Sequence, residues 1–335
     1  MLRSFQQQTK PFPLGKVLSY YRSFFPKPFV QAIYILMLSV FGTNALVAAE
    51  MDKIKHEVVS DSQCSIKKIL KIQDGYYSEH FGKLFNSAIN SEVYQLEDNK
   101  IFSYRFELID INLHEKEIFT QGFVIENDYY YEVSGSLGSS KLYKFSTKTN
   151  QLQSKLKLPK NIFAEGIALV DDNIVLVSLK TGKGYFVSKN SLNIESTFQF
   201  SHDGWGIAYF EENLIISDGD SNLYWYSKDG KKRLGVKQVK VAGIALKGIN
   251  EMEVVDDLIY ANIWPTDCVA VIEPLQSKVI AWIDISKLNP WVERGHWSHV
   301  SNGLAYDRIN QELWVTGKNW EHIYKLKIQK SSFSY

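Results

Sequence analysis

Five segments of the 335-residue chain can be laid over one another, and this internal repeat limits the fold more than any other feature. Each segment reads as a short apolar run, an acidic or Asn-containing turn and a second apolar run. That pattern is typical of a β-hairpin. The fifth segment carries two extra residues in its turn. The segments cover residues 119–135, 163–179, 203–219, 249–264 and 301–318.

The spacing of the segments predicts the architecture. Their equivalent positions, Gln121, Glu165, Trp205, Asn250 and Asn302, lie 44, 40, 45 and 52 residues apart. Periods of about 40 to 50 residues with four strands per unit are typical of propeller blades. The units show no helical period, which argues against a solenoid, and a β-sandwich would not require this self-similarity. We therefore expect an all-β chain with a five-bladed β-propeller over residues 106–330.

Composition agrees with this prediction and narrows the function. Aromatic residues make up 14% of the chain, and they favour the pleated surface of strands. A net charge of +1, without a basic stripe, argues against nucleic-acid binding.

The N-terminus indicates export. Basic residues such as Arg22 and Lys27 precede an uncharged stretch, residues 28–49, that ends in small residues. A secretory signal has these parts, and the stretch is also long enough for an uncleaved anchor. We expect residues 1–49 to be a signal peptide or membrane anchor, with the remainder periplasmic or extracellular. Contact with a membrane is expected only through that anchor.

Residues 50–105 lie outside the repeat and form an extension to which the sequence assigns no role. A short strand is expected at residues 66–72 and a helix near residues 80–89. The chain has two cysteines, Cys64 and Cys268. They can pair in an oxidising compartment, but spacing alone does not establish the geometry of a disulfide, and we expect two separate, partly buried thiols.

The repeat also points to a site. The innermost strand of each blade lines the channel of a propeller, so the five equivalent positions should form a ring, called here the first ring. The ends of the second strands should form a second ring. Such convergent polar and aromatic groups fit either a small-molecule site or a structural ring that binds ordered water. The second ring consists of Gly135, Leu179, Gly219, Trp264 and Lys318.

At these residues the sequence resembles the plant- and bacterial-type glutaminyl cyclases (glutaminyl-peptide cyclotransferases). The resemblance extends from about residue 106 to residue 327 and follows all five repeats in order. The matching motifs are Phe119-Thr-Gln-Gly122, Tyr131-Glu-Val-Ser-Gly135, Phe163-Ala-Glu-Gly166, Asp203-Gly-Trp-Gly206, Ser217-Asp-Gly219, Asn250-Glu-Met-Glu253, Tyr260-Ala-Asn-Ile-Trp264, Asn302-Gly303 and Val315-Thr-Gly-Lys318.

The resemblance implies a fold, a reaction and a site. The family is a five-bladed propeller that converts the N-terminal glutamine of peptides or proteins into pyroglutamate and releases ammonia. By position, Glu165 would be the general acid–base residue, and Gln121 and Lys318 would bind the γ-carbonyl oxygen. Substrate-binding positions by the same argument are Phe163, Trp205, Asn250, Trp264 and Asn302.

Three positions depart from the family pattern. The family usually carries Trp at Leu179, Glu at Asp203 and Gly at Ala164. The positions assigned to chemistry are intact, so we interpret these changes as altered substrate fit. Leu179 is also the feature that favours the main alternative, a non-catalytic exported propeller that binds or scaffolds.

A metal-dependent hydrolase is the third interpretation. The seven His residues show no His-x-His or His-Glu-x-x-His pattern, which argues against a catalytic metal. We expect no required cofactor, and the sequence leaves room only for a structural cation in the channel.

Overall fold

The computed structural model describes residues 64–81, 101–290 and 300–330, all of them within one unit, Ile54–Tyr335. The predicted signal or anchor segment, residues 1–49, lies outside the described residues. In the described part of the chain, no helix is both long and apolar enough to span a bilayer.

Three antiparallel four-stranded sheets follow one another along the chain. In each, the strands pair in sequence order. The first sheet contains β2 (Thr120–Glu126), β3 (Tyr129–Ser134), β4 (Lys141–Ser146) and β5 (Leu152–Lys157). The second contains β6 (Ala164–Val170), β7 (Asn173–Ser178), β8 (Lys183–Ser188) and β9 (Ile194–Gln199). The third contains β10 (Ile207–Phe210), β11 (Asn213–Ser217), β12 (Asn222–Ser227) and β13 (Arg233–Gln238).

The remaining strands form one ten-stranded sheet. Its first antiparallel run is β16 (Ile249–Val255), β17 (Leu258–Ile263), β18 (Cys268–Glu273) and β19 (Lys278–Asp284). Its second run is β20 (Ser301–Asp307), β21 (Glu312–Gly317), β22 (His322–Gln329) and β1 (Phe102–Leu113). Parallel pairing of β1 with β19 joins the two runs. The short strands β14 (Lys240–Val241) and β15 (Ile244–Ala245) attach beside β19, and a 3-10 helix, η2 (Ser286–Leu288), follows it. The expected all-β architecture is confirmed.

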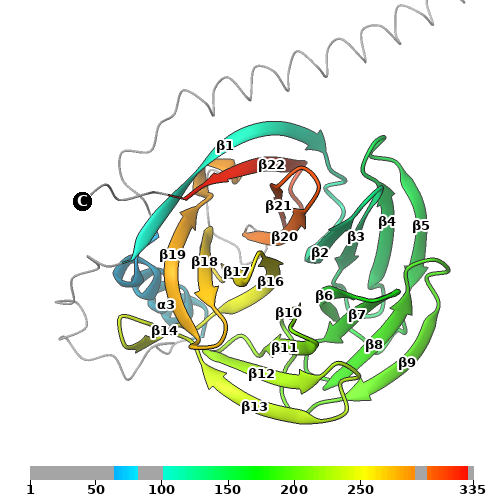
Figure 1. Cartoon of the computed structure of the whole chain (residues 1–335), viewed down its shortest axis with the longest axis horizontal. Coiled ribbons are helices and arrows are strands. Elements are labelled where there is room, and N and C mark those ends of the chain that lie inside the picture. Colours follow the sequence, from blue (N-terminus) through cyan, green and yellow to red (C-terminus); the bar gives the residue numbers. More distant parts are fainter. Residues whose placement is uncertain (1–63, 82–100, 291–299, 331–335) are drawn as a thin grey trace, which may run out of the picture. The chain divides into compact units, whose positions relative to one another are not determined.

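The first strand of each four-stranded sheet or run faces a common centre (Figure 1). These innermost strands are β2, β6, β10, β16 and β20. These strands contact one another in a closed cycle, in the order β2, β6, β10, β16, β20 and back to β2. Equivalent residues at their beginnings are therefore brought to one end of the assembly.

The hairpin turns follow the chemistry expected from the repeat. Two-residue turns separate the first and second strands of four units, and the fifth unit has four residues between β20 and β21. Asn127, Asp171, Glu211 and Asp256 have φ between 47° and 54°, in the left-handed region. Such backbone angles suit the tight turns of antiparallel hairpins.

Apolar residues from neighbouring sheets form the cores between them. One cluster joins Val133 and Leu142 to Ile174 and Leu176, and comparable clusters fill the other junctions among the described residues. Each fully buried aliphatic side chain of this kind contributes about 1.5 to 3 kcal/mol of transfer free energy. The sheets are therefore held by burial at their junctions, even where no backbone ladder connects them.

The extension departs from the sequence-based expectation. Residues 66–72, expected as a strand, belong to the helix α3 (Ile66–Phe81). Ile66, Ile69, Leu70 and Gln73 are buried, and their spacing is that of one helix face. The three apolar residues of this face pack in the cluster around β16–β19. A helix was also expected near residues 80–89. From residue 82 onward this segment lies outside the described residues.

A disulfide fastens this helix to the sheet. Cys64 and Cys268 are bonded, with their Cα atoms 5.5 Å apart, so the preference for two separate thiols was wrong. A sequence separation of 204 residues gives no geometric hint of the pair. Only the packing of α3 against β18 brings the two sulfurs together.

Candidate active site

The site begins at irregularities in the innermost strands. The register between first and second strands shifts at four of the five units, between Thr120 and Gly122, Ala164 and Ile167, Ile249 and Met252, and Ser301 and Leu304. These intervals contain Gln121, Glu165, Asn250 and Asn302. A β-bulge re-aims a side chain that regular pairing would direct elsewhere. The bulges thus coincide with the predicted first-ring residues.

A recurring hydrogen bond places the second ring beside the first. In four units a second-ring N–H donates to the carbonyl two residues before the first-ring position. The pairs are Gly135 to Phe119 at 3.0 Å, Leu179 to Phe163 at 2.9 Å, Trp264 to Gly248 at 2.8 Å and Lys318 to Val300 at 3.1 Å. In the remaining unit, the third, Trp205 precedes β10 and its N–H donates to the Ser217 carbonyl at 2.9 Å. Both predicted rings therefore lie at the same end of the innermost strands.

Two first-ring amides bond to each other. Nδ2 of Asn302 donates to Oε1 of Gln121 at 2.9 Å and to the Thr120 carbonyl at 3.0 Å. Gln121 and Asn302 are 2% and 0% exposed, so these bonds form away from bulk water. Because Oε1 of Gln121 already accepts, its Nε2 group is the end that can donate to another molecule.

Glu165 and Lys318 form a buried pair of ionisable groups. Burial raises the pKa of Glu165 to about 8; the positive charge of Lys318 opposes this rise, and nearby Asp203 adds to it. Burial likewise lowers the pKa of Lys318 to about 8, against the attraction of Glu165. The Lys318 ammonium also lies 5.1 Å from the centre of the Phe119 ring. Such a carboxyl and ammonium can exchange protons near neutral pH.

Aromatic side chains complete the arrangement. The rings of Trp205 and Trp264 meet edge to face, with their centroids 5.8 Å apart. A Cβ atom at Gly219, where φ is +79°, would lie 2.3 Å from the Trp205 ring. A Cβ at Gly135 would lie 2.5 Å from the ring of Phe163 and 2.6 Å from Cγ of Gln121. The two glycines of the second ring therefore let the first-ring side chains approach closely.

Buried polar atoms in the first ring lack partners. Oδ1 of Asn250, Oδ1 of Asn302 and Nε1 of Trp205 accept or donate no hydrogen bond among the described residues. Unsatisfied buried polar groups cost free energy, and in a ring of such groups they suit a ligand that supplies the complementary atoms. All eight predicted site residues thus converge at the same end of the strands.

Comparison with known proteins places the chain in a family. The sequence profile described as glutamine cyclotransferase matches residues 83–328. The chain belongs to the glutamine cyclotransferase family. It is similar to the glutaminyl-peptide cyclotransferase of Arabidopsis thaliana, at 32% identity over 225 residues, covering 65% of this chain and 70% of that protein.

A solved structure gives the same result. The crystal structure of Myxococcus xanthus glutaminyl cyclase superposes with a TM-score of 0.63 and 28% identity. The match covers 69% of this chain and all of the bacterial chain. This member of the glutamine cyclotransferase family is therefore similar to a bacterial glutaminyl cyclase in both sequence and fold.

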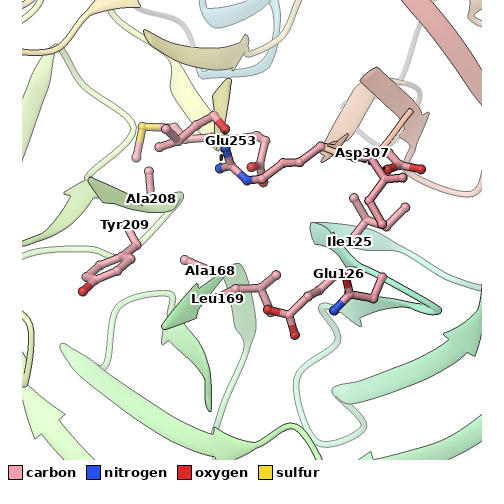
Figure 2. A pocket seen from close by; sticks show the side chains of 13 residues that line it. Ile125, Glu126, Ala168, Leu169, Ala208, Tyr209, Glu253 and Asp307 are labelled. Carbon is pink, nitrogen blue, oxygen red and sulfur yellow. Dashed lines mark hydrogen bonds between the residues drawn. The ribbon is translucent and has the colours of Figure 1, made fainter. Parts of the chain in front are cut away.

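A separate cavity of about 260 Å³ lies at the other ends of the same strands (Figure 2). Ile125, Ala168 and Ala208 line it, and none of the predicted site residues does. Burial raises the pKa of Glu253 here to about 8, opposed by Arg308. The Arg308 guanidinium also donates to the Val254 carbonyl at 3.1 Å. This cavity is not the predicted site.

The structure adds residues that the sequence did not single out. Glu251 is fully buried next to Asn250, and it accepts hydrogen bonds from the backbone of Leu304 at 2.9 Å and Phe123 at 3.4 Å. It therefore ties three innermost strands together. Across residues 64–81, 101–290 and 300–330, no group of three His, Cys, Asp or Glu side chains is placed to hold a metal ion.

Proposed function

We propose that this protein is a glutaminyl-peptide cyclotransferase, an acyltransferase that converts the N-terminal glutamine of peptides or proteins into pyroglutamate and releases ammonia. The observation that carries this proposal is the buried Glu165–Lys318 pair at the same end of the innermost strands as Gln121, in a chain of the glutamine cyclotransferase family. The proposed mechanism uses only side chains of this chain and no cofactor.

For the fold, we propose a five-bladed β-propeller. The three four-stranded sheets and the two four-stranded runs of the joined sheet would be the five blades of a propeller, spanning residues 106–330. The closed cycle of contacts among the innermost strands supports this arrangement.

Glu165 would carry the proton transfers. The substrate's α-amine nitrogen attacks its own γ-carboxamide carbon, a C–N bond forms and the carbonyl becomes an oxyanion. Glu165 as carboxylate takes a proton from the attacking nitrogen. It then returns this proton to the amide nitrogen, which leaves as ammonia when its bond to carbon breaks. A carboxyl with a pKa raised toward the working pH suits both steps.

Gln121 and Lys318 would stabilise the oxyanion. The hydrogen bond from Asn302 to Oε1 of Gln121 leaves Nε2 of Gln121 as the end of the amide that can donate. Lys318 would add a positive charge that is little screened because its side chain is buried. Donors of this kind, fixed before the charge develops, stabilise the transition state more than the ground state.

Asn250 and the aromatic residues would hold the substrate. Oδ1 of Asn250 would accept a hydrogen bond from a substrate N–H, and Nε1 of Trp205 would donate one to a substrate carbonyl. Phe163 and the edge-to-face pair of Trp205 and Trp264 would keep the glutamine side chain folded back on its amine. This orientation makes the reaction intramolecular and well aligned.

An oxidising compartment fits this proposal. We propose that residues 1–49 direct export, with residues 50–105 as an extension preceding the propeller. The bond between Cys64 and Cys268 supports this, because structural disulfides persist mainly outside the reducing cytosol.

Ammonia release from peptides tests the function. The full chain is incubated with a peptide that starts with Gln, beside a no-enzyme blank. Matched control peptides start with Asn, whose shorter side chain cannot close the same ring, or with N-acetylated Gln, whose amine is blocked. Release well above the blank with the Gln peptide alone supports the proposal. No release above the blank from a folded sample that still binds the peptide would instead indicate a binding module, as the Leu179 departure suggests.

A further inference from the structure

A buried ion pair lies behind the proposed oxyanion-binding residues. Nε2 of His114 is 3.0 Å from both carboxylate oxygens of Glu132, and their side chains are 1% and 0% exposed. Nδ1 of His114 lies 2.7 Å from the Trp320 carbonyl. Because both ring nitrogens face acceptors, the imidazole satisfies both only when both nitrogens carry protons. Burial lowers the pKa of His114, but Glu132 and the carbonyl outweigh this and raise it overall.

The pair connects to the turn that carries Lys318. The carbonyls of Gly317 and Trp320 flank this residue along the chain. His114 donates to the Trp320 carbonyl, while the Trp320 N–H donates to the Gly317 carbonyl at 3.1 Å. One hydrogen bond therefore closes the turn between Gly317 and Trp320, and another joins its Trp320 end to the His114–Glu132 pair.

Thr120 links the pair to both strands. Its hydroxyl donates to Oε1 of Glu132 at 2.6 Å and lies 3.2 Å from the Gly317 carbonyl. A hydroxyl has one proton, so the shorter bond to the carboxylate dominates. The hydroxyl nonetheless sits between the carboxylate and the residue that precedes Lys318.

The backbone of Thr120 faces the first ring. Its carbonyl accepts from Nδ2 of Asn302 at 3.0 Å, the same group that donates to Oε1 of Gln121 at 2.9 Å. A continuous set of buried contacts therefore runs from His114 to the residues on either side of the proposed oxyanion position.

We propose that Thr120, held by the His114–Glu132 pair, is a positioning residue that sets the placement of Gln121 relative to Lys318. This inference rests on the proposed cyclotransferase function. Thr120 would not contact the substrate. It would act by holding the ends of β2 and β21 in register, so that both donors meet the same oxygen as charge develops on it.

Thr120→Val tests this role, because Val keeps the shape and removes the hydroxyl. Thr316→Val is the matched control. Thr316, on β21, is as fully buried as Thr120, but its hydroxyl donates to the His322 carbonyl at 3.0 Å, which is not part of the network. The readouts are kcat and KM for ammonia release from a Gln peptide. Circular dichroism and Tm establish that each variant is folded.

The expected result is a selective loss of turnover. Thr120→Val should lower kcat at least 10-fold and change KM less than 3-fold, since the role concerns the transition state. Thr120→Ser should restore kcat to within about 3-fold, and Thr316→Val should leave kcat unchanged. Equal kcat losses in Thr120→Val and Thr316→Val, or unchanged kcat in folded Thr120→Val, would overturn the inference.

If Thr120→Val does not fold, a second variant tests the proposed role of the His114–Glu132 pair. His114→Gln keeps a donor toward Glu132 and removes the one toward the Trp320 carbonyl, so it should lower kcat with KM little changed. Unchanged kcat in this folded variant would overturn the role of the pair. An inactive wild-type chain would contradict the proposed function itself, which separates that failure from failure of the inference.

Discussion

Asn302 donates a 2.9 Å hydrogen bond to Oε1 of Gln121, so the orientation of the Gln121 amide is determined inside the protein before any substrate arrives. The acceptor end of this amide is occupied and its donor end is left for a ligand. The first-ring residues Gln121 and Asn302 of this chain are thus coupled, because the amide of Asn302 determines which end of the Gln121 amide can donate.

Substitution of Asn302 should therefore act through Gln121. Asn302→Ala leaves the Gln121 amide unoriented, and we expect kcat to fall about 10-fold. Asn302→Asp replaces the donor with an acceptor and favours the reversed Gln121 amide. The loss of kcat in this variant should reach about 100-fold, as for removal of an oxyanion donor. Steady-state ammonia release measures both. A smaller loss in Asn302→Asp than in Asn302→Ala would contradict the assigned orientation.

The buried pair predicts a bell-shaped dependence of kcat/KM on pH. Glu165 must be ionised, and its pKa is raised to about 8, so activity should rise with pH up to that value. Lys318 must be protonated, and its pKa is lowered to about 8, so activity should fall above it. The substrate's own amine also titrates near 8 on the rising side, which makes the falling side the diagnostic one.

Lys318→Arg tests the falling side. An arginine stays charged throughout this range, so the alkaline fall should move above about pH 10, although the peak rate should drop because the guanidinium has another shape. The measurement is kcat/KM from pH 6 to pH 10.5 for both proteins. A fall at the same pH in the variant would show that another group controls it.

The disulfide should contribute to stability through the long loop that it closes. In the chain-entropy description, a cross-link between residues separated by 204 positions lowers the conformational entropy of the unfolded chain. This effect stabilises the folded state by about 5 kcal/mol. Cys64→Ser should therefore lower the denaturant midpoint markedly. The double variant with Cys268→Ser should be no less stable than the single one, because one bond is lost in each case. An additive further loss would mean that the thiols act separately.

Leu179→Trp should affect substrate binding more than stability. Leu179 is half-buried in the second ring, and its N–H donates to the Phe163 carbonyl, so a larger ring there has room to extend toward solvent while adding an aromatic surface near Phe163. We expect a lower KM for Gln peptides and a Tm within a few degrees of the wild type. An unchanged KM across several peptides would count against this placement.

Much of the fold was predictable because it repeats. The hairpin turns, including the longer turn of the fifth unit, lie where acidic and Asn residues interrupt the apolar runs, and these are local signals. The convergence of Glu165 with Lys318, 153 positions later in the sequence, followed from the two rings that the repeats predict, with Glu165 in the first ring and Lys318 in the second. A periodic sequence thus carries long-range information that single segments lack.

Other features depend on tertiary contacts and left no local signal. The register shifts at Gln121 and Glu165 are properties of strand pairs, not of either strand's sequence. The His114–Glu132 contact and the cysteine pair likewise form only when separate elements pack. The spacing of Ile66, Ile69 and Leu70 does match one face of a helix. A short apolar run, however, is compatible with both a strand and a helix, so this spacing alone did not predict α3.

The central claim is that Glu165 moves the proton during cyclisation, and Glu165→Gln tests it most directly. The measurement is kcat for ammonia release from a Gln peptide by the wild-type and variant chains, with Tm and near-UV circular dichroism as the check on folding. The account predicts a loss of at least 100-fold in a variant that remains folded, in keeping with removal of a general acid–base group. A folded Glu165→Gln variant that retains near-normal kcat would contradict the account.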